Sequence, residues 1–184
     1  NRFYDVSRGS IEINGIDIRK YDLESLRAQI GYVAQKAHMF KGSIRSNICF
    51  GKPEASVEEM HHAASVAQAS DFISKRENGY LDEIAEDGTN ISGGQKQRLS
   101  IARVILKKPS LYIYDDSFSA LDFKTDATLR KALKPEVKNA IFFVVAQRIS
   151  TIMDSDMIIV LDEGQIIGLG THLELLKNCS VYQE

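Results

Sequence analysis

The sequence has little cysteine and no long apolar run. Its two cysteines, Cys49 and Cys179, lie far apart in the chain. Two isolated thiols do not form a disulfide framework or a cysteine-based metal site, so we interpret both as reduced cytosolic thiols at small buried positions. No stretch approaches the run of about 18 apolar residues that spans a bilayer, and the first residues lack a signal-peptide pattern.

A strong charge of one sign is also missing. The formal net charge is −2 over 184 residues, and this near-neutral balance argues against nucleic acid as the main partner. A chain of this length is one large domain or two small ones, and it can bury a sizeable hydrophobic core. The sequence as it stands is therefore expected to be a soluble globular protein.

Hydrophobic periodicity divides the sequence into three parts. In residues 1–35 it predicts a strand pair around an Asn14-Gly15 turn, a short helix over 23–29 and a strand ending at Gln35. Residues 36–107 lack convincing strands and are predicted to form an inserted helical subdomain. From residue 108 to 184, strands and helices alternate.

This alternation predicts the fold class. Strands are expected over 111–115, 140–146, 156–162 and 165–170, and helices over 124–134, 149–153 and 171–178. The pattern is typical of an α/β fold with a mostly parallel sheet and helices on both of its faces. In such sheets, ligands bind just beyond the carboxyl ends of the strands.

Four polar residues stand at or just beyond predicted strand ends. They are Gln35, Asp115, Asp116 and Gln147. A polar residue ends most strands, so each one alone indicates nothing. Because the carboxyl ends of parallel strands meet at one edge of a sheet, however, all four are expected to line a single functional site.

A second candidate site opens the long helix that precedes the strand over 111–115. Its residues are Ser92, Gly93, Gly94 and Gln95. The glycines let backbone amides approach a ligand, and the helix N-terminus supplies partial positive charge, so the segment is a candidate phosphate-binding cap. A lone Ser-Gly-Gly is more often a turn, but here an apolar strand ending in two carboxylates follows one helix later.

Together these motifs resemble the ABC transporter ATPases over about residues 1–180. The segment ISGGQ (91–95) is similar to the signature motif of that family, LYIYDD (111–116) to its Walker B strand, and SALD (119–122) to its D-loop. Gln35 matches the Q-loop glutamine. The resemblance implies a P-loop NTPase core of the ABC type, with ATP and Mg²⁺ as ligands.

Other segments resemble exporters in particular. HMFKGSIRSNI (38–48) is similar to the form found in exporters with fused membrane domains, and EIAEDG (83–88) sits at their X-loop, although Asp87 stands where a basic residue is usual. VVAQRISTI (144–152) occupies the H-loop position, and residues 157–176 match the last hairpin and helix of the family.

The phosphate-cradling loop of the family, G-x-x-x-x-G-K-[ST], is absent. The sole Gly-Lys pair, Gly51-Lys52, precedes Pro53 in the helical part and does not fit. The resemblance therefore implies that the sequence begins after this loop, without the adenine-stacking strand and the membrane domain. By itself such a fragment is expected to bind ATP weakly or not at all.

The resemblance assigns roles to the strand-end residues. Asp115 would orient Mg²⁺ through its water shell, and Gln35 would reach both the metal and the attacking water; Mg²⁺ prefers such oxygen ligands. Asp116 stands where active members have a glutamate base. It is shorter by one methylene, about 1.5 Å of reach, and a misplacement of about 1 Å can cost on the order of 100-fold in rate. Asp116 is therefore expected to be a poor base.

Gln147 replaces the switch histidine of the family. Glutamine can donate a hydrogen bond but cannot become a cation or shuttle a proton. Together with Asp116 it marks a degenerate site, a pattern found in bacterial heterodimeric exporters. Because ABC ATPases dimerise head to tail, the segment 92–95 would complete the site of a second nucleotide-binding domain. Asp122, at the end of the D-loop, is also implied to bind the nucleotide, and Tyr80 to Gly88 would touch coupling helices of a transmembrane domain. The implied location is the cytoplasmic face of the cell membrane.

Two other functions fit parts of the sequence. A pseudo-ATPase fragment that only binds a partner agrees with the missing phosphate loop. A soluble ABC-type ATPase of DNA maintenance or translation shares the same core, but chromosome-type relatives insert long coiled coils between Gln35 and Ser92, where this sequence has a compact helical part.

Overall fold

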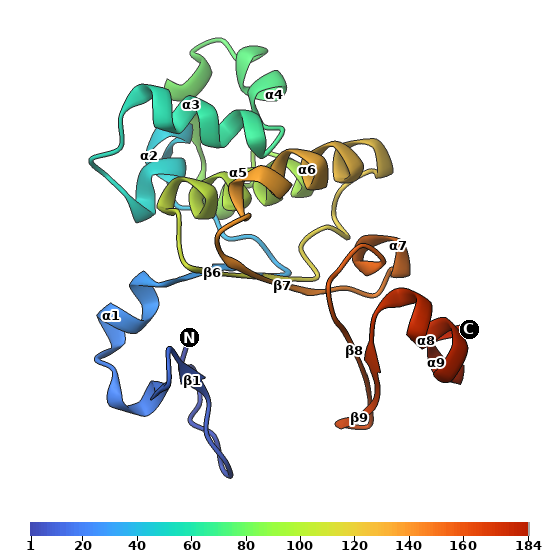
Figure 1. The fold of residues 1–184 in the computed structure, drawn as a ribbon. Coiled ribbons are helices and arrows are strands. Elements are labelled where there is room, and N and C mark those ends of the chain that lie inside the picture. Colours follow the sequence, from blue (N-terminus) through green and yellow to red (C-terminus); the bar gives the residue numbers. More distant parts are fainter. Residues whose placement is uncertain (184) are drawn as a thin grey trace. The chain divides into compact units, whose positions relative to one another are not determined.

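The computed structural model describes residues 1–183 and divides the chain into two compact units. The first is Asn1–Val145, and the second begins at Ala146. Helices and strands alternate along both (Figure 1), so the α/β fold class expected from the sequence is confirmed.

A parallel sheet lies at the centre of the first unit. Its strands are β3 (Ile30–Val33), β6 (Leu111–Asp115) and β7 (Ile141–Val145), in the order β3-β6-β7. The register places Tyr32 opposite Ile113 and Asp115 opposite Val145. All three strands therefore end at the same edge of the sheet, as the sequence predicts.

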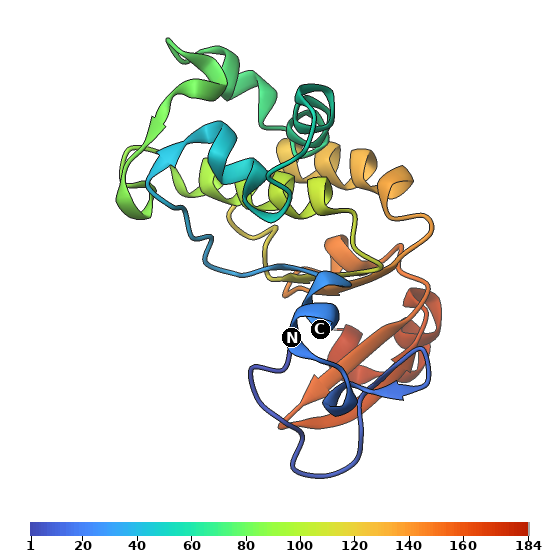
Figure 2. The ribbon, with the colours of Figure 1, turned by 90° about the vertical axis from the view of Figure 1, so that its left-hand side faces the viewer.

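Helices lie on both faces of this sheet. On one face, α5 (Gly93–Lys107) and α6 (Phe123–Glu136) lie side by side. On the other lies α1 (Leu23–Ala28), as Figure 2 shows. Alternate side chains of β6 supply the two cores, because successive residues of a strand point to opposite faces: Tyr112 and Tyr114 belong to the larger cluster, Leu111 and Ile113 to the smaller one.

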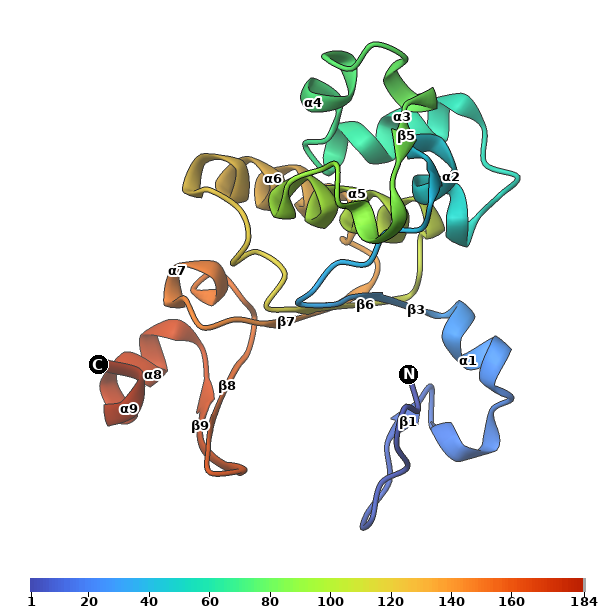
Figure 3. The same ribbon diagram turned by 180° about the vertical axis from the view of Figure 1, so that it is seen from behind.

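The helices between β3 and β6 form a layer beyond α5. They are α2 (Ile44–Ile48), α3 (Val57–Val66) and α4 (Ser70–Ser74), seen from behind in Figure 3. Helix α5 contacts α2 and α3 on one side and β3 on the other. Apolar residues on most of its circumference are consequently buried, among them Leu99, Ile101 and Ile105.

The helical part also contains one short strand pair that the sequence does not predict. β4 (Gly42–Ser43) and β5 (Glu83–Ile84) pair antiparallel, and the amide of Ile44 donates to the carbonyl of Asp82 at 3.0 Å. Two residues per strand are too few to show an alternating pattern, so periodicity cannot detect them. The segment boundaries 1–35, 36–107 and 108–184 remain a prediction.

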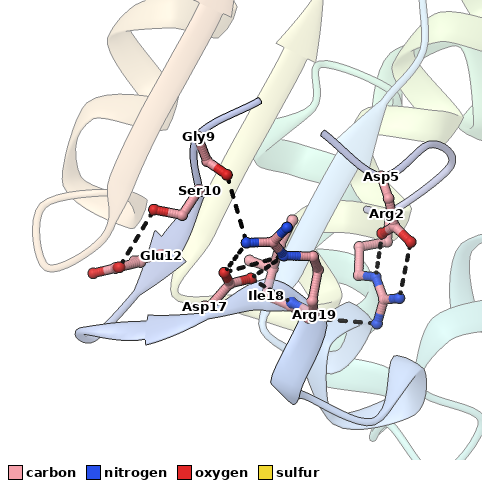
Figure 4. A network of polar contacts seen from close by, with 8 residues as sticks. All are labelled: Arg2, Asp5, Gly9, Ser10, Glu12, Asp17, Ile18 and Arg19. Carbon is pink, nitrogen blue, oxygen red and sulfur yellow. Dashed lines mark hydrogen bonds and ion pairs between the residues drawn. The ribbon is translucent and has the colours of Figure 1, made fainter. Parts of the chain in front are cut away.

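The first residues fold around a small hairpin. β1 (Glu12–Ile13) and β2 (Ile16–Asp17) pair antiparallel across Asn14 and Gly15, whose φ angles of 53° and 74° suit the tight turn predicted there. Figure 4 shows the polar contacts beside it: the guanidinium of Arg19 donates to the Asp17 carboxylate, and Arg2 donates to Asp5.

The second unit is a hairpin with short helices. α7 (Ile149–Ile152) precedes β8 (Ile158–Asp162) and β9 (Gln165–Gly170), which pair antiparallel, and α8 (His172–Asn178) and α9 (Ser180–Gln183) follow. Its core consists of Ile158, Leu175, Cys179 and Tyr182. Cys49 and Cys179 are both buried, as expected. Within residues 1–183, no helix is long and apolar enough to cross a membrane.

Close contact between β3 and α5 makes Gly31 a sensitive position. A Cβ there would lie 2.5 Å from Cγ1 of Val104 and 2.6 Å from Cγ of Pro109. Gly31→Ala is therefore expected to destabilise the protein by about 1–3 kcal/mol through overpacking. Chemical denaturation measures the effect. The control is Glu24→Ala on the exposed surface of α1, whose free energy of unfolding should stay within about 0.5 kcal/mol of the wild-type value. Equal unfolding free energies for both variants would contradict the packing described here.

Candidate functional site

The edge where β3 and β6 end brings Gln35, Asp115 and Asp116 together. The side-chain amide of Gln35 donates to Oδ2 of Asp116 at 3.1 Å. The hydroxyl of Tyr32 donates to Oδ2 of Asp115 at 2.9 Å. The end of β3 thus contacts both carboxylates at the end of β6. The convergence of these three predicted site residues follows from the parallel pairing of the two strands.

Asp116 begins a tight turn after β6. Its φ of 42° lies in the left-handed region, which Asp and Asn enter more readily than other non-glycine residues. Three hydrogen bonds fix the turn. The Asp116 amide donates to the carbonyl of Val145 at 2.9 Å. The Asp116 carbonyl accepts from the Ser119 hydroxyl at 2.6 Å and from the Ser119 amide at 3.3 Å. Consecutive side chains of a regular strand point to opposite faces. Because the strand ends at Asp115, the carboxylates of Asp115 and Asp116 can both contact residues at the end of β3.

The sequence motifs assign no role to the hydroxyl groups of Tyr32, Tyr114 and Ser117. Those of Tyr114 and Ser117 are buried and have no hydrogen-bond partner among residues 1–183. Burial raises the pKa of Tyr114, and burial followed by the Asp115 contact raises the pKa of Tyr32. The sequence contains no signal for Tyr32, because its contact with Asp115 depends on the register between β3 and β6.

The predicted phosphate-binding segment forms the start of α5. Ser92 is the N-cap: its hydroxyl accepts from the Gln95 amide at 3.3 Å, and the Gln95 side chain accepts from the Ser92 amide at 3.0 Å. A Cβ on Gly93 would meet nothing within 4 Å, whereas one on Gly94 would lie 3.2 Å from the carbonyl oxygen of Ala120. The two glycines thus differ: one leaves open space at the helix start, and the other permits a close backbone contact.

A buried glutamine connects α5 to the segment that holds Gln35. Gln97 is 1% exposed, and its side-chain amide donates to the carbonyl of Ala34 at 3.2 Å. This bond fixes the backbone next to Gln35 relative to the helix that begins at Ser92. The sequence gives no signal for it, because Gln97 looks like a polar residue on a helix surface.

Asp122 is the N-cap of α6. Its carboxylate accepts from the Thr125 amide at 3.0 Å and from the Thr125 hydroxyl at 2.7 Å. The amide bond and then the hydroxyl bond lower the pKa of Asp122. The segment from Ser119 to Asp122 therefore spans from the Asp116 turn to the first turn of α6.

Gln147 follows the end of β7 by two residues and lies at the start of the second unit. Its side chain is exposed. Its proximity to Asp116 rests on strand order alone and stays a prediction.

The oxygen donors at the strand ends fit a magnesium ion. Asp115 offers a carboxylate and Gln35 an amide oxygen, and Mg²⁺ is usually bound by one or two such groups together with waters and substrate phosphates. Among residues 1–183, no three His, Cys, Asp or Glu side chains form a group that could hold an ion by themselves. The donor set therefore suits an ion that arrives with a phosphate-bearing ligand.

Sequence comparison identifies a family. The family model described as ABC transporter matches residues 1–119. A protein of Bacillus subtilis named for multidrug export and for an ATP-binding/permease role is 47% identical over 99% of this chain and 31% of its own length. The ATP-dependent lipid A-core flippase of Vibrio vulnificus is 40% identical over 100% of this chain and 32% of its own length.

A solved structure is also similar. A bacterial Atm1-family ABC exporter with ATP bound has a TM-score of 0.96 and 40% identity, covering 99% of this chain and 32% of that one. The present chain spans about a third of the length of these relatives.

The N-cap at Asp122 predicts a pH-dependent contribution to stability. Because the folded pKa lies below the unfolded value of about 3.9, the carboxylate stabilises the fold above that pH, and the contribution is lost as pH falls through the folded pKa. The variant Asp122→Asn keeps an oxygen acceptor but has no charge. The difference in unfolding free energy between wild type and this variant should be largest near pH 7 and shrink below about pH 4. If the difference in unfolding free energy stayed constant from neutral to strongly acidic pH, the charge of Asp122 would not contribute to stability as predicted.

Proposed function

Because the chain belongs to the ABC transporter family as an ATP-binding domain of the exporter type, we propose that it powers export across a membrane within a longer protein. The observation that supports this most directly is the cluster of Gln35, Asp115 and Asp116 at the ends of β3 and β6. The N-capped, glycine-containing start of α5 adds a surface suited to phosphate.

We assign the chemistry to three side chains. Asp115 would hold the water shell of Mg²⁺, which when bound neutralises charge on the phosphates. Gln35 would orient the metal and the attacking water, and Asp116 would accept a proton from that water. In the present structure the Gln35 amide is hydrogen-bonded to Asp116. Nucleotide binding would therefore have to exchange this contact for contacts to water and metal.

We further propose that this site is slow. Asp116 has one methylene less than glutamate, and it stands on a left-handed turn that fixes its backbone. Its carboxylate cannot recover the missing reach by a backbone shift without breaking the bonds to Val145 and Ser119. Gln147 would hold a γ-phosphate by a hydrogen bond but could not supply a positive charge.

The faster site would be on a partner. In a head-to-tail pair, the segment 92–95 and Asp122 of this chain face the nucleotide of a second nucleotide-binding domain. The asymmetry of the carboxylate and H-loop positions favours a heterodimer, in which a different subunit supplies a competent base. The assembly would lie at the cytoplasmic face of the cell membrane.

The contact to the membrane domain is proposed near Tyr80 to Gly88. Tyr80 stacks on His61 with ring centroids 4.5 Å apart, and Lys96 donates to the carbonyl of Asp87 at 2.7 Å. These contacts attach the segment to α3 and to the first turns of α5. A push on this segment by a coupling helix would thus reach the start of α5 directly.

Restoring the usual residues should speed up the slow site. In the full-length protein, Asp116→Glu combined with Gln147→His is expected to raise turnover at this site on the order of 10–100-fold, because the base regains its reach. The gain is opposed by the cost of placing glutamate at a positive φ. Steady-state ATP hydrolysis by the full-length protein, alone and with its partner, measures the effect. Unchanged turnover, with nucleotide binding intact, would show that reach is not limiting.

Blocking the start of α5 should impair the partner's site. Ser92→Arg is expected to lower ATP hydrolysis of the mixed dimer on the order of 100-fold, since a bulky cation displaces the phosphate-facing backbone. The matched control is Ser56→Arg, because Ser56 caps α3 through the same type of capping box, with Glu59. The control should hydrolyse ATP at the wild-type rate. Full activity of the Ser92→Arg dimer, or rapid hydrolysis by a homodimer of this chain, would refute the proposed division of labour.

A further inference from the structure

Tyr32 lies on the same face of the sheet as Asp115. The register pairs Tyr32 with Ile113, and Ile113 and Asp115 share a face because they are two residues apart on β6. Two residues of a strand span about 6.6 Å, a distance that the length of a tyrosine side chain covers. Its hydroxyl accordingly reaches Oδ2 of Asp115 at 2.9 Å.

The ring of Tyr32 is held in this direction. It is half-buried, and the ring of Phe3 packs edge-on against it, with centroids 6.0 Å apart and an interplanar angle of 70°. Ile30 and Ile113 on the same face belong to the smaller hydrophobic core, in which Leu111 also packs. A hydroxyl carried on a restrained ring is a fixed donor, unlike one at the end of a mobile side chain.

We propose that Tyr32 is a positioning residue for the metal-orienting carboxylate. By donating to Oδ2, it fixes the rotamer of Asp115 and directs Oδ1 towards the site of the ion. Within residues 1–183, no other side chain donates to the Asp115 carboxylate. This inference rests on the proposed function, because it assumes that Asp115 holds Mg²⁺ with a nucleotide.

The end of β3 then has two similar tasks. Tyr32 holds the first carboxylate of β6, and Gln35 holds the second. Both contacts depend on the same strand pairing. Loss of the Tyr32 hydroxyl should weaken metal binding without disturbing the fold, because phenylalanine fills the same space and keeps the ring contact with Phe3.

The test uses the full-length protein with Mn²⁺ as a paramagnetic substitute for Mg²⁺. Binding of Mn²⁺ in the presence of a non-hydrolysable ATP analogue is followed by electron paramagnetic resonance. Tyr32→Phe is expected to weaken Mn²⁺ binding about 10-fold, the usual effect of losing a group that orients a metal ligand. Binding of the same analogue in EDTA, without metal, should stay unchanged. A general loss of structure would weaken both Mn²⁺ binding and metal-free binding of the analogue.

Tyr114→Phe is the matched control. Tyr114 lies on the neighbouring strand, and its hydroxyl has no hydrogen-bond partner within residues 1–183. Its removal should leave Mn²⁺ affinity at the wild-type value. Mn²⁺ binding by Tyr32→Phe within twofold of wild type would overturn the assignment of Tyr32 alone. Failure of the wild type to bind Mn²⁺ with the analogue would overturn the proposed function together with it.

Discussion

The parallel pairing of β3 with β6 is the constraint on which the site depends. Residues 34–110, which form helices, loops and one short strand pair, separate these strands in sequence, yet the ladder places their carboxyl ends side by side. Glutamine from one strand and aspartates from the other meet for this reason. Helix α5 enforces the pairing, because it packs on β3 at Gly31 and anchors the following backbone through Gln97.

Elements with strong periodicity were predictable from the sequence. The strand over 111–115 agrees residue for residue, and the Asn14-Gly15 turn was recognisable because both positions favour positive φ. The convergence of Gln35 with Asp115 and Asp116 was also predictable, since it requires only a parallel sheet. The family followed from motif order and is supported independently by the match over residues 1–119.

Other features depend on tertiary contacts that no local pattern encodes. The bond between Tyr32 and Asp115 requires one particular register, and a shift by one residue would turn the tyrosine to the opposite face. Gln97 is buried because α5 lies between helices α2 and α3 and strand β3. The two-residue strands at Gly42–Ser43 and Glu83–Ile84 are too short for any pattern. The position of Gln147 relative to the carboxylates stays a prediction.

The close approach of Gly94 to Ala120 has a mechanical consequence. Because a Cβ on residue 94 would lie only 3.2 Å from the carbonyl oxygen of Ala120, the beginning of α5 and the segment after Asp116 are in close backbone contact. In the proposed dimer, the start of α5 faces the partner's nucleotide, whereas the turn that leads to Ala120 begins at Asp116 of this chain's own site. A shift of the helix start at the partner's nucleotide would therefore press on the backbone next to Asp116, which links the two sites mechanically.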